Sequence, residues 1–151
     1  MSYKRILVPV DGCAVSNRGL TEAVKMARAG RAKLRLLHVV DELAVFSMSE
    51  AGASIGPILE SVRAAGKRKL ARIARRVRGL NIRTESALVE GAGRRVADFI
   101  VDDARRWRAD VIVMGTHGRR GVKRMLLGSD AELVIRYSPV PVLLVPGSRR
   151  R

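Results

Sequence analysis

One stretch of the chain, GTHGRRGVKRMLLGSDAE (115–132), combines glycines with positively charged side chains directly after an apolar run. Its first three glycines, spaced three residues apart, permit positive φ angles and close approach of the backbone, so their N–H groups can line an anion. Gly128 and Ser129 then open a new helical pattern, and a helix N-terminus offers free N–H groups and partial positive charge. This pattern indicates a phosphate-binding site, although glycines between a strand and a helix also serve as turn residues and Ser129 also suits a helix N-cap.

The elements that must position this stretch alternate along the chain. Short apolar runs rich in β-branched residues are separated by longer amphipathic segments, which is the pattern of βαβ units and a mainly parallel sheet. The predicted strands are 5–10, 33–40, 82–88, 110–114 and 140–145. The predicted helices run from an N-cap at Ser16 to Gly30, over 59–80, over 96–107, and from about Ser129. The fold class is therefore α/β, with a single doubly wound domain over 1–146.

Two segments do not follow this alternation. The segment AVFSMSEAGASIGP (44–57) is rich in small residues and weakly periodic, which predicts a long flexible loop. The segment GSRRR (147–151) predicts a basic, disordered tail outside the domain. Gly66 lies on the apolar stripe of the second helix, where it either costs stability or lets the helix pack closely on the sheet.

The carboxyl ends of parallel strands lie along one edge of a sheet, where open α/β sheets bind their ligands. This rule gathers Asp11 and Gly12 after the first strand, HVVD (38–41) at the end of the second, and GTHG (115–118) after the fourth. His38 lies beside a buried strand and is interpreted as a structural histidine. Cys13 is the only cysteine, so no intrachain disulfide can form, and it is interpreted as a small turn residue.

The spacing of the glycines matches a known family. The pattern G-x-x-G, nine residues, then G-[ST] is met by Gly115, Gly118, Gly128 and Ser129, and ILVPVDG, LLHVVDE and SPVPVLLVP occur around it in order. With these motifs the chain resembles the universal stress proteins over essentially its whole length. The resemblance implies a five-stranded parallel sheet of order 3-2-1-4-5, of the adenine nucleotide alpha hydrolase-like type. It also implies ATP binding, which goes with the glycine motif, and a role as a nucleotide-dependent sensor or regulator in the stress response.

The resemblance also implies roles for single residues. Asp11 would contact the nucleoside, the backbone of Val39 would meet adenine, and Gly115 would lie against the ribose. Gly118, Gly128 and Ser129 would hold the phosphates. Asp11 is also suited to be a mere turn former, but a carboxylate at this edge is well placed to accept from ribose hydroxyls or an adenine amine. One departure from the family is Cys13, where a serine is common.

Other side chains near the glycines offer charge rather than catalysis. Arg119 and Arg120 can reach a triphosphate, as can Lys123 and Arg124, although each alone is more often a solvated surface charge. His117 has no carboxylate at a recognisable spacing to orient it as a general base. Without a set of acid, base and nucleophile, binding is favoured over catalysis, and at most slow ATP hydrolysis is expected. The two histidines show no metal-ligand spacing, so Mg²⁺ would arrive with the phosphates of ATP.

The net charge is the unusual feature of the composition. The chain has 30 Lys and Arg against 14 Asp and Glu, a formal +16, and such an excess attracts polyanions in general. Eight basic residues and no acidic one lie in 61–80, so a nucleic-acid-binding module is the alternative function. A dimeric adaptor with a structural nucleotide is a third possible function. Only 3% of the residues are aromatic, so the chain has few side chains on which bases can stack, and nucleic acid is expected to bind only non-specifically.

The two ends of the domain give expectations about location and assembly. The apolar run near the N-terminus has five residues, too short for a signal peptide or a membrane span, so a cytoplasmic protein without a membrane partner is expected. In the implied order the last strand is a sheet edge, and Pro139 and Pro141 suit an edge. An uncovered apolar edge invites aggregation. We expect a homodimer through Val140, Val142, Leu143 and Leu144, with a monomer covered by the tail or a loop as the alternative.

Overall fold

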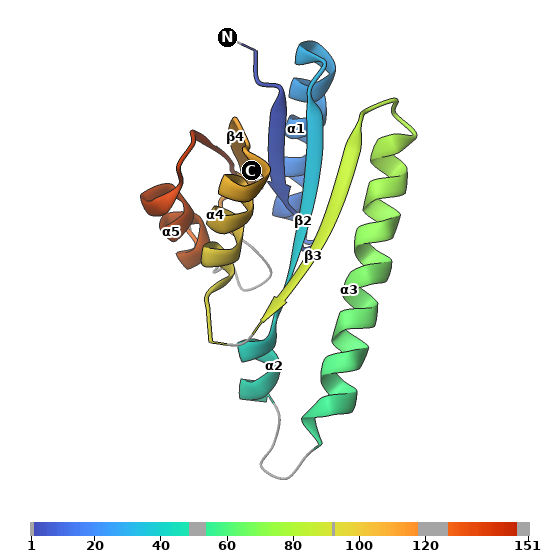
Figure 1. Ribbon diagram of the computed structural model, residues 1–151, viewed down its shortest axis with the longest axis vertical. Coiled ribbons are helices and arrows are strands. Elements are labelled where there is room, and N and C mark those ends of the chain that lie inside the picture. Colours follow the sequence, from blue (N-terminus) through green and yellow to red (C-terminus); the bar gives the residue numbers. More distant parts are fainter. Residues whose placement is uncertain (1, 49–53, 92, 118–126, 148–151) are drawn as a thin grey trace.

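The computed structural model describes residues 2–48, 54–91, 93–117 and 127–147. Five strands form one parallel sheet in the order β3-β2-β1-β4-β5, which confirms the predicted α/β class and the implied order (Figure 1). The strands are β1 (Arg5–Pro9), β2 (Lys33–Asp41), β3 (Thr84–Gly91), β4 (Val111–Gly115) and β5 (Val142–Val145). The helices are α1 (Ala14–Gly30), α2 (Glu42–Met48), α3 (Ile55–Arg78), α4 (Val96–Trp107) and α5 (Ser129–Tyr137).

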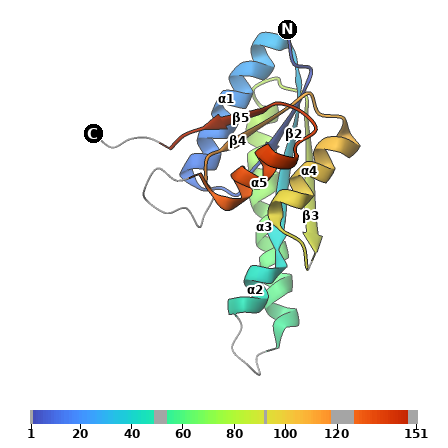
Figure 2. The ribbon, with the colours of Figure 1, turned by 90° about the vertical axis from the view of Figure 1, so that its left-hand side faces the viewer.

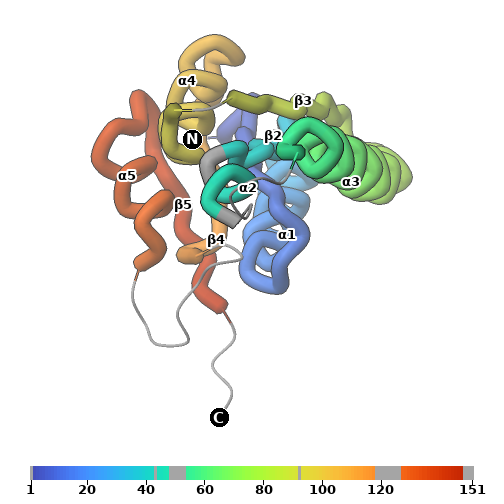
Figure 3. Tube along the Cα trace, turned by 90° about the horizontal axis from the view of Figure 1, so that it is seen from below, coloured from blue at the N-terminus to red at the C-terminus, as the bar shows by residue number. Residues whose placement is uncertain are grey.

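Helices cover both faces of the sheet. Seen along the sheet, α1 and α3 lie on one side and α4 and α5 on the other (Figure 3). Because successive side chains of a strand point to opposite faces, β1 sends Ile6 and Val8 into the core under α1 and α3, and Leu7 into the core under α4 and α5. None of the helices in the described part of the chain combines the length and apolarity needed to cross a membrane.

The prediction of one long loop over 44–57 is wrong. Helix α2 follows β2 without a break, and the Asp41 carboxylate accepts a hydrogen bond from the backbone N–H of Ala44 (3.0 Å), as at a helix N-terminus. Helix α3 already begins at Ile55, and Pro57 fits its first turn because no intrahelical partner awaits an N–H there. Both helices extend beyond the end of the sheet (Figures 1 and 2). Only 49–53 of the predicted loop lie outside the described residues.

The start of α1 also differs from the prediction. The N-cap is Cys13, whose Sγ accepts the backbone N–H of Ser16 (3.3 Å), so Ser16 itself is inside the helix and is not the cap. The Ser16 hydroxyl instead accepts the backbone N–H of Asp11 (3.2 Å). The sole cysteine is therefore more than a small turn residue: it ties the end of β1 to the first turn of α1.

Two strands begin later than predicted. After α3 the chain turns through Asn81, whose φ is 58°, and β3 starts at Thr84. Strand β5 starts at Val142 because Pro139 and Pro141 have no N–H for the ladder. The predicted edge position of this strand is confirmed, since β5 pairs with β4 on one side only within the described sheet.

Candidate functional site

The carboxyl ends of β1, β2 and β4 meet at one edge, and there Asp11 shapes the turn into α1. Its Oδ1 accepts the backbone N–H of Cys13 (2.8 Å), so Asp11 is a turn former as well as a carboxylate at the edge. Burial raises the pKa of the Cys13 thiol beside it, with the neighbouring Asp11 carboxylate adding to the effect. Cys13 therefore stays protonated and serves as a cap at neutral pH.

A lysine that the sequence did not single out lies over this turn. Gly12 has a positive φ of 81°, and a Cβ placed on it would lie 3.1 Å from Cδ of Lys69, in the middle of α3. The Lys69 side chain therefore crosses from α3 to the edge beside Asp11. The only sequence signal for this residue was its membership of the basic run 61–80, which does not say which of the eight charges faces the edge.

Strand β2 continues beyond the last residue of β1, so the backbone groups at its end that face the β1 side lie past the β1 ladder. The last β1–β2 pair is Pro9 with Leu37, and the Leu37 carbonyl oxygen accepts the Val10 N–H (2.8 Å). Successive residues of a parallel strand direct their N–H and C=O groups to alternating sides. Val39, two residues beyond Leu37, therefore directs its backbone groups to the same side, past the end of the β1 ladder. Its side chain is half-buried against the core under α4 and α5.

His38 is the structural histidine that the sequence predicted. Its ring is buried, and Nδ1 lies 2.7 Å from the carbonyl oxygen of Val10. Gly66 of α3 lies against the other side of the ring, because a Cβ there would be 3.0 Å from His38 Cδ2. Of the two predicted roles for Gly66, close packing of the helix on the sheet is thus the one that the structure shows.

Gly115, at the end of β4, is needed for packing. A Cβ on Gly115 would lie 2.8 Å from Val15 Cγ1 and 3.0 Å from the Val15 carbonyl carbon and oxygen. Gly19, one turn further along α1, approaches the same strand, since its Cβ would lie 3.1 Å from the Gly115 nitrogen. These two glycines bring α1 into close contact with the end of β4.

The N-terminus of α5 is fixed beside the end of β4. The Gly128 N–H donates to the Thr116 carbonyl oxygen (2.8 Å), and a Cβ on Gly128 would lie 3.2 Å from both that oxygen and His117 Cα. Gly128 is the N-cap and, as a glycine, has no side chain with which to cap the helix, so the alternative interpretation of Ser129 as the N-cap is wrong. Ser129 is the first helical residue and its side chain is exposed.

The remaining residues of the glycine-rich stretch divide into two groups. His117 Nδ1 lies 3.2 Å from the Thr116 hydroxyl oxygen, so its neighbour is a hydroxyl and not a carboxylate. Gly118 and Arg119 lie outside the described residues, together with Arg120, Lys123 and Arg124. Within the described ranges, no three His, Cys, Asp or Glu side chains gather as metal ligands would.

This architecture defines the class of protein. The strand order reverses between β1 and β4, and in doubly wound α/β folds ligands bind outside the carboxyl ends of the strands at such a switch point. Residues 2–146 match the universal stress protein family. The chain therefore belongs to the universal stress protein family.

Individual relatives agree with this assignment. Universal stress protein MJ0531 of Methanocaldococcus jannaschii is 34% identical over 143 residues, covering 95% of this chain and 82% of the relative. The solved structure of MJ0577, a universal stress protein of the same organism, has a TM-score of 0.85 at 28% identity, covering 99% of this chain and all of the other.

Two other solved relatives hold nucleotides. One is a universal stress protein in complex with cAMP, with a TM-score of 0.63 at 25% identity over 98% of this chain and 100% of the relative. The other is the universal stress protein from Archaeoglobus fulgidus in complex with dAMP, with a TM-score of 0.66 at 25% identity over 96% and 99% of the two chains. Both nucleotides carry adenine, so relatives of this chain bind adenine nucleotides.

Proposed function

We propose that this universal stress protein binds ATP at the carboxyl edge of the sheet and acts as a nucleotide-dependent sensor or regulator of the stress response. The observation that carries the proposal is the position of the α5 N-terminus. The hydrogen bond from Gly128 to Thr116 holds it beside the end of β4, at the switch point, and its N-cap residue is a glycine, which has no side chain to occupy the first N–H groups. A phosphate group is the ligand that suits free N–H groups at a helix N-terminus.

The base is expected to be adenine. The backbone at Val39 faces the gap beside β1, where its C=O can accept from the adenine amine and its N–H can donate to a ring nitrogen. Guanine presents the reverse pattern on its Watson–Crick edge, a carbonyl acceptor beside an N–H donor. The cAMP and dAMP complexes of the relatives support an adenine site in this fold. Asp11, at the same edge, supplies a carboxylate for the ribose hydroxyls, and Gly115 brings the backbone near them.

The triphosphate then extends toward α5. Gly128 and Ser129 would hold phosphate oxygens, with Gly118 and Arg119 of the family motif contributing from outside the described residues. Any Mg²⁺ would arrive with the nucleotide, on phosphate oxygens. His117 has a hydroxyl and not a carboxylate beside it in the described part of the edge. We therefore assign ATP a regulatory role, with at most slow hydrolysis.

The first experiment identifies the nucleotide. The purified protein is denatured, any released nucleotide is identified by mass spectrometry, and ATP and GTP are then titrated by calorimetry into protein freed of nucleotide. We expect ATP to bind at least tenfold more tightly than GTP, which corresponds to about 1.4 kcal/mol. Equal affinities would show that the base is not read at Val39, and no binding of either would overturn the proposal.

A charge variant tests the phosphate position without disturbing the fold. Ser129→Asp places a carboxylate in the first turn of α5, where it suits the helix dipole and preserves the helix but repels phosphates. We expect ATP affinity to fall at least tenfold while the melting temperature stays constant or rises. Asn81→Asp adds the same charge at the amino-terminal end of the sheet, in an exposed turn whose positive φ also suits aspartate, and is the control. Replacement of Gly128 is less clean, because any Cβ there meets the backbone of Thr116.

A further inference from the structure

The two helical layers that cover the sheet differ in charge. Helices α1 and α3 together carry eleven basic and two acidic residues, an excess of nine positive charges. Helices α4 and α5 together carry three basic and five acidic residues, an excess of two negative charges. Since each pair covers one face of the sheet (Figure 3), one helical layer is basic and the other is slightly acidic.

On α3 the basic residues occupy the outward half of the helix. Its buried residues, Gly66, Leu70, Ile73, Ala74 and Val77, form the stripe against the sheet. The exposed basic residues on the solvent side of the helix are Lys67, Arg68, Arg72, Arg75, Arg76 and Arg78. Ala71 is the one exposed apolar residue among them from 67 to 78. This set of exposed basic residues is called the α3 basic face below.

Acidic residues do not neutralise this face. The single acidic residue of α3, Glu60, lies 3.8 Å from Arg63 in the first part of the helix, and Arg63 also contacts Glu42 and Glu90. Among the ion pairs of the described residues, none involves Lys67 or the arginines of the α3 basic face. Arg78 donates to the Thr84 carbonyl oxygen (3.4 Å), which is neutral. Charges of one sign along a helix that no carboxylate pairs attract a polyanion.

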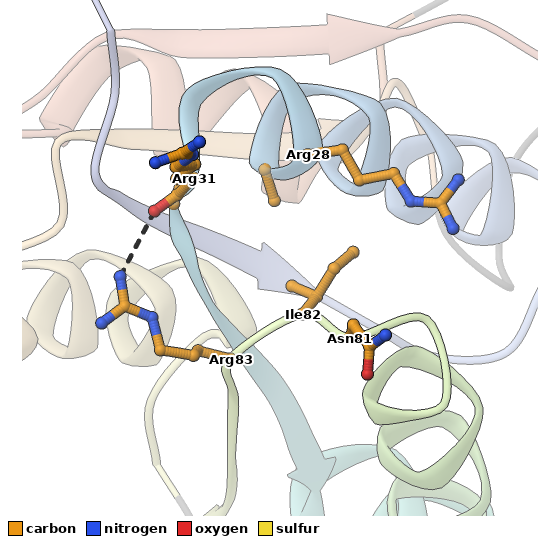
Figure 4. Close-up of a pocket in the computed structure, with 7 residues that line it drawn as sticks. Arg28, Arg31, Asn81, Ile82 and Arg83 are labelled. Carbon is orange, nitrogen blue, oxygen red and sulfur yellow. Dashed lines mark hydrogen bonds between the residues drawn. The ribbon is translucent and has the colours of Figure 1, made fainter.

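The basic surface continues past the end of α3 into a pocket of about 350 Å³ at the amino-terminal edge of the sheet. Arg28 and Arg31 from the end of α1, and Arg83 before β3, line it (Figure 4). The guanidinium groups of Arg28 and Arg83 lie at opposite ends of the pocket, and Arg83 donates to the Arg31 carbonyl oxygen (3.3 Å). Because the three side chains do not converge, the pocket extends the α3 basic face and is not a cage for one small anion.

We propose that the α3 basic face, continued by Arg28, Arg31 and Arg83, binds the phosphate backbone of a nucleic-acid duplex. The helix rises about 17 Å from residue 67 to 78, the length of about five base pairs along the axis of a duplex at 3.4 Å each, so its basic side chains can reach several phosphates. An extended row of unpaired cations suits such a regular row of phosphates. Contacts of this kind position a protein on a duplex and read no bases.

The composition of the face distinguishes this partner from other polyanions. A membrane-binding helix also needs large apolar side chains among its basic ones, and from 67 to 78 α3 exposes only Ala71. The exposed Ile58, Val62 and Leu80 lie before and after this range. A protein that binds single strands stacks the bases on aromatic rings. The large exposed aromatic side chains of the described residues are Phe46 and Tyr137, which lie on α2 and α5. A duplex, whose bases are already stacked, needs neither feature.

The test compares two triple variants of the full chain. In Arg72→Gln/Arg75→Gln/Arg76→Gln, glutamine keeps the helix propensity and removes three charges from the α3 basic face. The control, Arg105→Gln/Arg106→Gln/Arg136→Gln, removes three charges from α4 and α5. Binding to labelled 20-base-pair DNA and RNA duplexes is measured by fluorescence anisotropy between 50 and 200 mM NaCl, the range over which phosphate contacts lose most affinity.

We expect the wild type to bind duplexes of unrelated sequence equally, with an affinity that falls steeply with salt. The α3 triple variant should lose at least tenfold in affinity at 50 mM NaCl, and its log–log salt slope should be shallower by about 2 to 3, one unit per lost phosphate contact. The control should match the wild type. If the two triple variants behave alike, if neither duplex binds, or if polyglutamate or anionic vesicles compete as well as duplex, the assignment is overturned.

The two sites can be tested separately. Residues 72–76 lie in the second half of α3, toward the amino-terminal edge, whereas the nucleotide edge is at the other end of the strands, where Lys69 meets Gly12. ATP binding by the α3 triple variant is therefore expected to equal that of the wild type, and Ser129→Asp is expected to retain duplex binding. Failure of one proposal leaves the other standing.

Discussion

At the scale of single residues, Gly115 packs α1 against β4 and is also proposed to lie against the ribose, and a substitution can test the packing role by itself. Gly115→Ala would place a Cβ 2.8 Å from Val15 Cγ1 and 3.0 Å from the Val15 backbone. Over-packing of this kind costs about 1 to 3 kcal/mol. We expect Gly115→Ala to lower the free energy of unfolding by that amount in urea denaturation, whether or not ATP is present.

Another glycine of the chain provides the matched control. Nothing lies within 4 Å of a Cβ placed on Gly56, in the first turn of α3. Gly56→Ala is therefore expected to change the free energy of unfolding by less than about 1 kcal/mol, because the higher helix propensity of alanine opposes the restriction that Pro57 places on the residue before it. If Gly115→Ala is as stable as Gly56→Ala, α1 and β4 are not in the close contact described, and the glycine serves the ligand alone.

The same residues show what the sequence can and cannot predict at this scale. The placement of Asp11 and Gly128 at one edge follows from strand ends and helix starts, which are local patterns. The contacts of Gly115 with Val15 and of Gly12 with Lys69 are tertiary, because they depend on how closely α1 and α3 approach the sheet. The cap at Cys13 was missed because Ser16 is the residue type that helix N-caps favour.

At the scale of elements, a partly buried charged cluster joins β2, β3 and α4. Arg35 binds Asp103 through two bonds, Nε to Oδ2 (2.7 Å) and Nη2 to Oδ1 (2.9 Å), and the Asp103 side chain is only 2% exposed. The Trp107 Nε1–H donates to Glu85 (2.7 Å), which also pairs with Lys33. The pKa of the Glu85 carboxyl is lowered by the hydrogen bond from Lys33 and, further, by the one from Trp107.

Removal of one charge from this cluster should be costly. Asp103→Asn leaves the Arg35 guanidinium without its carboxylate, and breaking a buried pair on one side costs about 3 to 5 kcal/mol. Arg35 remains partly exposed, so the lower end of that range is expected in urea denaturation. The neighbouring Asp102 pairs with Arg94 (2.6 Å) but is 35% exposed, so Asp102→Asn should cost less than about 1 kcal/mol. Equal losses would mean that the cluster under α4 is solvated.

Sequence periodicity predicts most elements of this chain but not this cluster. Short apolar runs located all five strands. The helical spacing of apolar residues located the helices that became α1, α3, α4 and α5, since each has a buried stripe long enough to detect. Helix α2 was missed because its seven residues are too few to show a period and its capping by Asp41 is a tertiary detail. Arg35 and Glu85 alternate with apolar residues, which looks the same in the sequence whether α4 or water covers that face.

At the scale of the whole molecule, the distribution of charge could not be predicted from the sequence. The sequence shows the basic run, but the contrast between a basic layer and a slightly acidic one exists only once α1 and α3 are assigned to the same face. Strand order likewise came with the family resemblance, because local patterns do not say which strands are neighbours. Once the order is known, β5 is an edge, and its exposed surface bears on assembly.

The surface beside β5 is apolar where the described part of the chain leaves it uncovered. Leu143 is 41% exposed, and Ile135 and Tyr137 of α5 are 46% and 55% exposed. Val142 and Leu144 are half-buried against the core under α4 and α5, so their exposed area is smaller than the sequence alone indicated. We propose a two-fold dimer in which β5 of each protomer covers the other, the commonest symmetry of soluble oligomers.

A single lysine tests this assembly. Leu143→Lys puts a charge into the proposed interface but changes no side chain of the core, whereas lysine at Val142 or Leu144 would also loosen the monomer. We expect the wild type to sediment as a dimer at 100 mM NaCl and Leu143→Lys as a folded monomer. Leu80→Lys, at a residue of similar exposure (40%) between α3 and β3, should remain dimeric because β3 and β5 are the opposite edge strands of the sheet. A monomeric wild type at high micromolar concentration, or a dimeric Leu143→Lys, would place the interface elsewhere.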